Sequence, residues 1–71
     1  MDDEAIDSSV LQGLCKEGPC KEDDLKRELG IDALDGVARL VQRGLAYRMQ
    51  GGFVIASAAG RHANSIDPTW A

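Results

Sequence analysis

The first apolar residues of the chain recur at the spacing of one helix face: Ile6, Val10, Leu11 and Leu14. This pattern predicts a helix over roughly residues 4–16, with acidic residues at its N-terminus, where the helix dipole favours negative charge. Gly18 accommodates the left-handed backbone that commonly ends a helix, and Pro19 cannot continue one. We therefore expect a tight connection over residues 17–20 before the next element.

Two further helices are predicted, separated by a short turn. Residues 22–29 combine an acidic first turn with apolar residues one helical turn apart, which predicts the second helix. Gly30 ends this helix, and Asp32 is placed to cap a third helix that should end near Arg43. The apolar, inward-facing positions of the third helix are Leu34, Val37, Leu40 and Val41. Two helices joined by a short turn that contains glycine match the spacing of a helix-turn-helix.

The pattern changes from helical periodicity to alternation after the third helix. Every second residue is apolar on both sides of Gly51-Gly52, which predicts a β-hairpin. The glycine pair supports the positive φ angles of a two-residue turn, with Gln50 and Gly51 as the alternative turn residues. We expect Tyr47 and Phe53 to be cross-strand neighbours in the core.

A last short helix is expected over residues 58–64. Ser57 is placed to cap its N-terminus, and Asp67-Pro68 is placed to terminate it. The predicted fold class is therefore α+β and mostly α, with three helices, a two-stranded hairpin and a short C-terminal helix.

Length and composition describe one small folded domain. The chain has 71 residues, of which 44% are hydrophobic and 28% charged, as in globular proteins. We expect a single domain over residues 1–71, with its core over roughly residues 4–66 and a tail at residues 67–71. A chain this short buries too little surface to enclose a deep pocket beside a core. Together with the lack of a nucleophile, base and oxyanion constellation, this argues against an enzyme and against a small-molecule substrate.

The two cysteines do not make a metal site at the sequence level. Cys15 and Cys20 are accompanied by one distant histidine, which leaves too few ligands for four-coordinate zinc. We interpret them as small buried hydrophobic residues in a reducing compartment, with a redox switch as the alternative, and expect no cofactor. No apolar run reaches the roughly 20 residues that span a bilayer, and the acidic N-terminus is unlike a signal peptide. We therefore expect a cytoplasmic protein without membrane contact.

Charge is distributed unevenly along the chain. Residues 1–35 contain eleven acidic and four basic residues, a net charge of minus seven. Residues 36–66 contain no acidic residue and four arginines: Arg39, Arg43, Arg48 and Arg61. Because summed charge governs encounter and non-specific binding, this division suggests one side that faces a polyanion and another that is solvated or faces a partner.

Three motifs resemble the winged helix-turn-helix family. The run LKRELGI at residues 25–31 is similar to the second helix and turn of that family, and residues 40–45 are similar to the exit of its third helix into the wing. The run IASAAGR at residues 55–61 is similar to a pattern common in antibiotic-resistance-type and arsenic-sensor-type transcriptional regulators. The resemblance implies a winged-helix fold in which the hairpin is the wing. It also implies a protein that lays its third helix in the DNA major groove and its wing on the adjacent backbone or minor groove.

The candidate DNA contacts are polar residues of the third helix, the hairpin and the flanking helices: Arg39, Gln42, Arg43, Arg48, Arg61 and Lys26. Arg39 is suited to guanine, Gln42 to adenine and Arg43 to phosphate. The competing interpretation of Arg39 is structural, because Asp35 precedes it by four residues, the spacing of an ion pair on an exposed helix. Asp32 and Asp35 also depart from the neutral or basic residues usual at the start of a recognition helix.

The sequence thus favours a small DNA-binding winged-helix protein, a transcriptional regulator or accessory DNA binder whose partner is double-stranded DNA. Its few phosphate contacts favour a homodimer, for which Trp70 and Ile66 are candidate contact residues. Alternatively, Trp70 folds back onto the first helix. The second functional hypothesis is a winged-helix module that binds another protein and not DNA, as an anti-repressor or a nucleic-acid mimic does.

Overall fold

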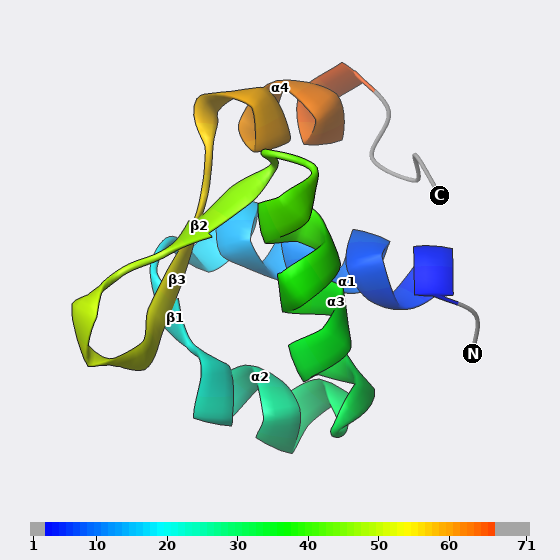
Figure 1. Ribbon diagram of the computed structural model, residues 1–71. Helices are drawn as coiled ribbons and strands as arrows, with labels where there is room; N and C mark the ends of the chain where they lie inside the picture. Colours follow the sequence, from blue (N-terminus) through cyan, green and yellow to red (C-terminus); the bar gives the residue numbers. More distant parts are fainter. Residues whose placement is uncertain (1–2, 67–71) are drawn as a thin grey trace.

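Four α-helices and a three-stranded antiparallel sheet make up residues 3–66, the part of the chain that the computed structural model describes (Figure 1). In chain order the elements are α1 (Asp3–Glu17), β1 (Cys20–Lys21), α2 (Glu22–Leu29), α3 (Asp32–Gln42), β2 (Ala46–Arg48), β3 (Phe53–Ala56) and α4 (Ala58–Ile66). A 3₁₀ turn, Gln50–Gly52, joins β2 to β3. The α+β class with mostly helical content, predicted from the sequence, is confirmed.

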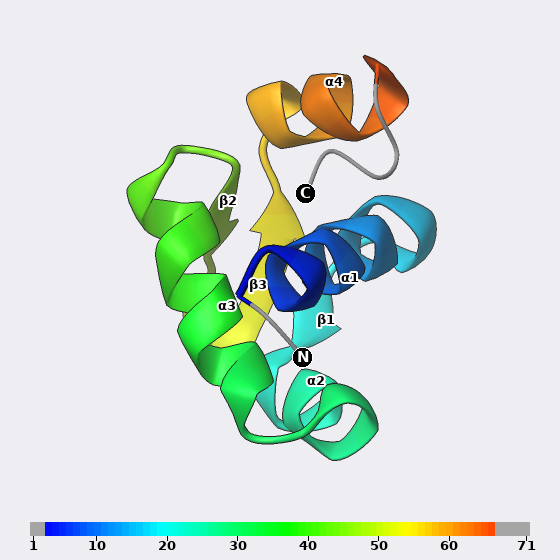
Figure 2. The ribbon, with the colours of Figure 1, turned by 90° about the vertical axis from the view of Figure 1, so that its right-hand side faces the viewer.

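Helix α1 lies at the centre of the fold (Figures 1 and 2). It contacts α3, α4 and β3, while α2 and α4 lie at opposite ends of the molecule. Helices α1, α2 and α3 and strands β2 and β3 supply the buried apolar side chains. These are Ile6, Val10, Leu11, Leu14, Leu25, Ala33, Val37, Leu40, Ala46, Val54 and Ala56. The four apolar residues that predicted the first helix are all in this core.

The three predicted helices are confirmed with small differences at their ends. Helix α2 has the predicted bounds, and α1 extends one residue further at each end than the sequence pattern indicates. Among the predicted inward positions of α3, Val37 and Leu40 are fully buried, whereas Leu34 and Val41 are half-buried. The inward face of α3 is therefore rotated slightly from the predicted one, toward Ala33.

The prediction that Asp32 caps α3 is wrong. Asp32 is the first residue of the helix, and Ile31 before it already has helical φ and ψ angles of −64° and −27°. The amide of Ala33 donates to the carbonyl of Gly30 at 3.1 Å, and the amide of Leu34 donates to the carbonyl of Ile31 at 3.1 Å. Because the chain is already turning as it enters the helix, backbone carbonyls satisfy these amides in place of a side-chain cap.

The sheet contains a strand that the sequence pattern does not predict. Strand β1 pairs antiparallel with β3, which gives the strand order β1-β3-β2. Cys20 lies opposite Val54, and Lys21 lies opposite Phe53. Two residues are too few to display an alternating pattern, so the strand is defined by its partner rather than by its own sequence. The predicted tight connection over residues 17–20 therefore ends in this strand.

The predicted hairpin is confirmed, but its two-residue turn is wrong. The amide of Met49 donates to the carbonyl of Phe53 at 2.7 Å, which encloses the three residues Gln50–Gly52. Gly51 and Gly52 have φ angles of 81° and 79°, which glycine adopts without steric cost. Both glycines thus have the positive φ angles predicted for them, in a loop one residue longer than expected.

The buried face of the hairpin is the opposite of the predicted one. Ala46 and Val54 are buried, whereas Tyr47 is 50% exposed and Phe53 is half-buried. Tyr47 lies opposite Ile55 rather than opposite Phe53, so the two aromatic residues are not the predicted core neighbours. Helix α3 contacts β2, and α1 contacts β3, on the inner face of the sheet. Small side chains there permit close approach, and the bulky residues consequently point outward.

Ser57 caps α4 as predicted. Its Oγ accepts a hydrogen bond from the amide of Gly60 at 3.0 Å, and its hydroxyl donates to the carbonyl of Gly44 at 2.7 Å. Ser57 therefore also ties α4 to the end of α3. The helix continues to Ile66, two residues beyond the prediction, and its predicted terminator, Asp67-Pro68, lies outside the described residues.

Candidate functional site

Arg39, the central candidate on α3, is held by a carboxylate of α1. Its Nε donates to the two Oδ atoms of Asp7 at 3.1 and 3.0 Å, and its Nη2 donates to Oδ1 at 2.8 Å. The Asp7 side chain is only 4% exposed, and Asp3 lies further out, 3.8 Å from Nη2. Charge-assisted bonds with this geometry are among the strong hydrogen bonds of proteins. The guanidinium is therefore directed toward α1.

A close approach of α1 and α3 makes this pairing possible. A Cβ at Gly36 would lie 3.0 Å from Oδ1 of Asp7, so glycine leaves the room that the carboxylate occupies. The hydrogen bond to Asp7 raises the pKa of Arg39 above its ordinary value; burial opposes this rise, and the charges of Asp7, Asp3 and Asp35 add to it. The hydrogen-bonding partner of Arg39 is thus Asp7, 32 residues away, while Asp35, the predicted partner, contributes through its charge alone.

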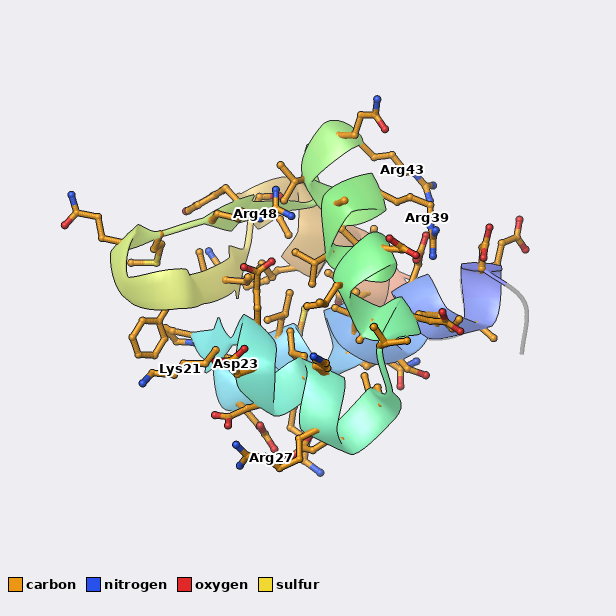
Figure 3. The ribbon with its side chains drawn as sticks, turned by 60° about the horizontal axis from the view of Figure 1, so that its bottom comes forward. Lys21, Asp23, Arg27, Arg39, Arg43 and Arg48 are labelled. Carbon is orange, nitrogen blue, oxygen red and sulfur yellow. The ribbon has the colours of Figure 1, made fainter. Side chains whose placement is uncertain are left out.

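Arg48 is paired as well, with the first residue of α2. Its Nε donates to Oε1 of Glu22 at 3.2 Å, and the two side chains are 49% and 27% exposed. An ion pair this exposed contributes up to about 1 kcal/mol to stability. Figure 3 shows Arg39 and Arg43 on one side of α3 and Arg48 on the other. The arginines of the acid-free segment therefore do not form one continuous basic face.

The remaining predicted contacts are spread over three helices. Gln42 and Arg43 are exposed at the C-terminal end of α3, and Lys26 is exposed on α2. Arg61 is exposed on α4, at the opposite end of the molecule from α2 (Figure 1). Two acidic residues, Asp32 and Asp35, are exposed on the first turn of α3. Gln42 and Arg43 are therefore neighbours by sequence alone, whereas Lys26 and Arg61 lie on helices at opposite ends of the molecule.

The side chains of both predicted dimer contacts lie outside the part of the chain that the structure describes. Ile66 is the last residue of α4, and Trp70 lies outside the described residues. A homodimer through these two residues, and the alternative in which Trp70 folds back onto α1, both stay predictions.

A second surface, which the sequence did not suggest, covers the outward side of the sheet. Residues that lie opposite each other in antiparallel strands project to the same side, and residues two apart do so as well. The registers of Lys21 with Phe53 and of Tyr47 with Ile55 therefore place five side chains together: Lys21, Phe53, Ile55, Tyr47 and Met49. We call these five residues the outer sheet face. Tyr47 and Met49 are 50% and 47% exposed, so the face is apolar and accessible.

A groove adjoins the outer sheet face at β1. It encloses about 350 Å³ between the end of α1, strand β1 and helix α2. Its lining residues are Glu17, Pro19, Cys20, Lys21, Asp24, Leu25, Glu28 and Phe53. We call it the acidic groove, because it contains three carboxylates and one ammonium group. Lys21 and Phe53 belong to both surfaces, and the Lys21 Nζ lies 5.5 Å from the centroid of the Phe53 ring.

The pKa of the Cys20 thiol is affected by the carboxylates of the acidic groove. Burial raises the pKa of Cys20, and the nearby carboxylates of Glu17, Glu28 and Asp24 raise it further. Its Sγ lies 3.3 Å from the carbonyl oxygen of Gly18 and 3.9 Å from Oε2 of Glu17. Three carboxylates from two helices therefore act on one point of the groove. A raised pKa lowers the thiolate fraction, and the thiolate is the nucleophilic form of cysteine.

Cys15 and Cys20 are both free thiols, and both are half-buried and packed against the hydrophobic core. Burial also raises the pKa of Cys15, against the opposing charge of Arg61. Among residues 3–66, no three His, Cys, Asp or Glu side chains are placed to hold a metal ion. Within the same residues, no helix is long and apolar enough to cross a bilayer.

Comparison of the chain with known protein families, curated proteins and solved structures finds no match. The signal for the outer sheet face was present in the sequence as the alternation Tyr47, Met49, Phe53 and Ile55, but it was assigned to the core. The acidic groove had no local signal, because its carboxylates come from two helices and other lining residues come from strands β1 and β3.

Proposed function

We propose that this protein is a winged helix-turn-helix module that binds another protein through its outer sheet face. Helices α2 and α3 with the turn between them correspond to the helix-turn-helix, and the β2-β3 hairpin corresponds to the wing. The strand β1 adds a third strand to that wing. This arrangement agrees in element order with the family resemblance of the three sequence motifs. Because one fold serves many functions, the ligand is argued from the surfaces alone.

The observation that carries the proposal is the exposure of Tyr47 and Met49 side by side on the wing. A wing that lies on DNA presents basic and polar groups to phosphate. Here the outward side of the wing is apolar except for Lys21. Tyrosine, phenylalanine and methionine are enriched at the centres of protein interfaces, whereas they contribute little to phosphate binding.

The state of the arginines supports the same conclusion. Arg39 would have to leave a nearly buried carboxylate before it could contact a base. Its neighbours on the first turn of α3, Asp32 and Asp35, would face the phosphates of a bound duplex and repel them. The net charge of −4 acts against DNA at longer range.

DNA binding is the second candidate function, and one observation favours it. Gln42 and Arg43 are adjacent and exposed at the end of α3, and their side chains are suited to adenine and to phosphate. In this alternative, Arg48 exchanges its exposed pairing with Glu22 for a phosphate, and Arg61 and Lys26 add contacts at the periphery.

Two measurements test the proposal together. Peptide ligands are selected from a random display library on the wild-type protein and then tested on a Tyr47→Ser/Met49→Ser variant. We expect them to lose binding to this variant and to keep binding to Ile31→Ser, which removes a 67% exposed apolar residue outside the outer sheet face. In parallel, labelled mixed-sequence duplex DNA is titrated at low salt, and no binding is expected.

Ligands that bind the wing variant as tightly as the wild type would overturn the proposal. So would duplex binding that weakens with salt and is abolished by Gln42→Ala/Arg43→Ala. Circular dichroism of each variant establishes that the fold is retained, so that lost binding is not mistaken for unfolding.

A further inference from the structure

The outer sheet face and the acidic groove form one continuous surface. Phe53 lies on the outer sheet face and also lines the groove, and Lys21 is shared in the same way. Apolar side chains therefore lead from β2 across β3 to a rim of carboxylates. A ligand that covers the exposed aromatic rings of the wing would therefore contact these carboxylates with one of its ends.

The carboxylates of the acidic groove differ in whether another side chain of the protein forms an ion pair with them. Arg27 lies 3.5 Å from Asp24, an exposed pair. Within the described part of the chain, Glu17 and Glu28 form no ion pair, and Glu17 contacts only the weak thiol donor of Cys20. Among residues 3–66, Lys21 is the one cation that lines the groove, and its Nζ lies over the Phe53 ring. Two carboxylates therefore remain available to a cation from outside.

We propose that the partner is a protein segment that places apolar side chains on the outer sheet face and a lysine or arginine in the acidic groove. This inference rests on the proposed function, which it extends from the surface to the chemistry of the partner. The groove volume of about 350 Å³ leaves room for one long side chain.

Charge complementarity selects this partner over others. The net charge of minus seven on residues 1–35, which contribute the groove carboxylates, attracts a basic segment and repels an acidic one. The apolar floor of Pro19 and Leu25 accommodates the methylene stem of a lysine or arginine while the charged end meets the carboxylates. Burial is the main cause of the raised pKa of Cys20, and the charges of Glu17, Glu28 and Asp24 add to it.

The test compares three synthetic peptides of equal length on the full-length protein. The first alternates valine with lysine, the second replaces lysine with glutamate, and the third replaces valine with serine and keeps lysine. Affinity is measured by fluorescence anisotropy, and the contact surface is mapped from amide chemical shifts. We expect the first peptide alone to bind, with shifts at Phe53, Tyr47 and Glu28.

Charge variants then locate the cation. Glu17→Gln/Glu28→Gln should weaken the valine-lysine peptide by about tenfold, since each exposed ion pair changes affinity by about two- to fivefold. The matched control is Asp32→Asn/Asp35→Asn, which removes the same charge from α3 and should leave the affinity within about twofold. Raising the salt concentration should reduce the difference between wild type and the groove variant.

Each other outcome overturns the inference, and the outcomes separate it from the proposed function. Equal binding of the glutamate peptide at the outer sheet face would refute the cationic partner and leave protein binding through the wing intact. Equal weakening by the groove and control variants would refute the groove as the cation site. Binding by none of the peptides, or by the serine-lysine peptide as well, would refute the combined apolar and basic chemistry. The display selection then decides on the proposed function by itself.

Discussion

Replacing Gly60 with alanine is expected to destabilise the fold, although alanine is the better helix former. Gly60 lies in the first turn of α4, and a Cβ there would overlap the backbone carbonyl oxygen of Leu45 and come within 3.2 Å of Cδ1 of Leu11. That carbonyl accepts a hydrogen bond from the amide of Ser57 at 2.9 Å. Leu45 therefore cannot give way without breaking the contact that joins α4 to the end of α3.

The magnitude follows from two opposing effects. Glycine to alanine inside a helix gains about 0.5–1 kcal/mol, whereas overpacking typically costs about 1–3 kcal/mol and sometimes more. Because the overlap is with backbone rather than with a flexible side chain, we expect the upper part of that range and a net loss of about 1–2.5 kcal/mol. In a domain of this size, 1 kcal/mol corresponds to about 4–8 °C in Tm, so Tm should fall by roughly 4–20 °C.

The assay is thermal and urea unfolding followed by far-UV circular dichroism. The matched control is Gly13→Ala in α1, where, apart from its chain neighbours and the backbone of its own helix, no described heavy atom lies within 4 Å of the new Cβ. It should stabilise the protein by about 0.5–1 kcal/mol. If Gly60→Ala is as stable as Gly13→Ala, the first turn of α4 does not lie against Leu45 and the placement of α4 described above is wrong.

Three further predictions concern the cap, the surface pair and the groove. Ser57→Ala should lower stability by about 1 kcal/mol, and an unchanged urea midpoint would show that the cap contributes nothing. A double-mutant cycle on Arg48 and Glu22 should give a coupling of up to about 1 kcal/mol that shrinks with added salt; a larger, salt-independent coupling contradicts an exposed pair. Because its pKa is raised, Cys20 should be alkylated at pH 8 more slowly than a free cysteine, and Glu28→Gln, which removes one carboxylate charge, should accelerate the reaction as measured by peptide mass spectrometry.

The parts of the fold that could be predicted are those with local causes. The bounds of α2 follow from its acidic first turn and from Gly30 at its end, and the cap of α4 follows from the Ser57 hydroxyl and the amide three residues later. The hairpin was found because alternation and two glycines act within a few residues. In each case the groups that determine the element are close together in the sequence, so its pattern contains the information.

The candidate site could not be predicted in the same way. Which side of the hairpin is buried depends on how closely α1 and α3 approach the sheet, and the small residues that allow this, such as Ala46, give little hydrophobic signal. Alternation of apolar residues in a hairpin distinguishes its two faces but does not indicate which face packs against the core. The bulky residues were therefore assigned to the core, although they form the outer sheet face.

The sequence by itself determined the helices, the hairpin and an uneven charge distribution, with four arginines in a segment that has no acids. Only the tertiary structure decided what those arginines do. Arg39 meets Asp7 from 32 residues away, and Arg48 meets Glu22 from 26 residues away. The physical reason is that charges interact through space: folding places acids of the first half beside arginines of the second. A stretch of sequence with a net positive charge therefore does not form a positively charged face on the folded molecule.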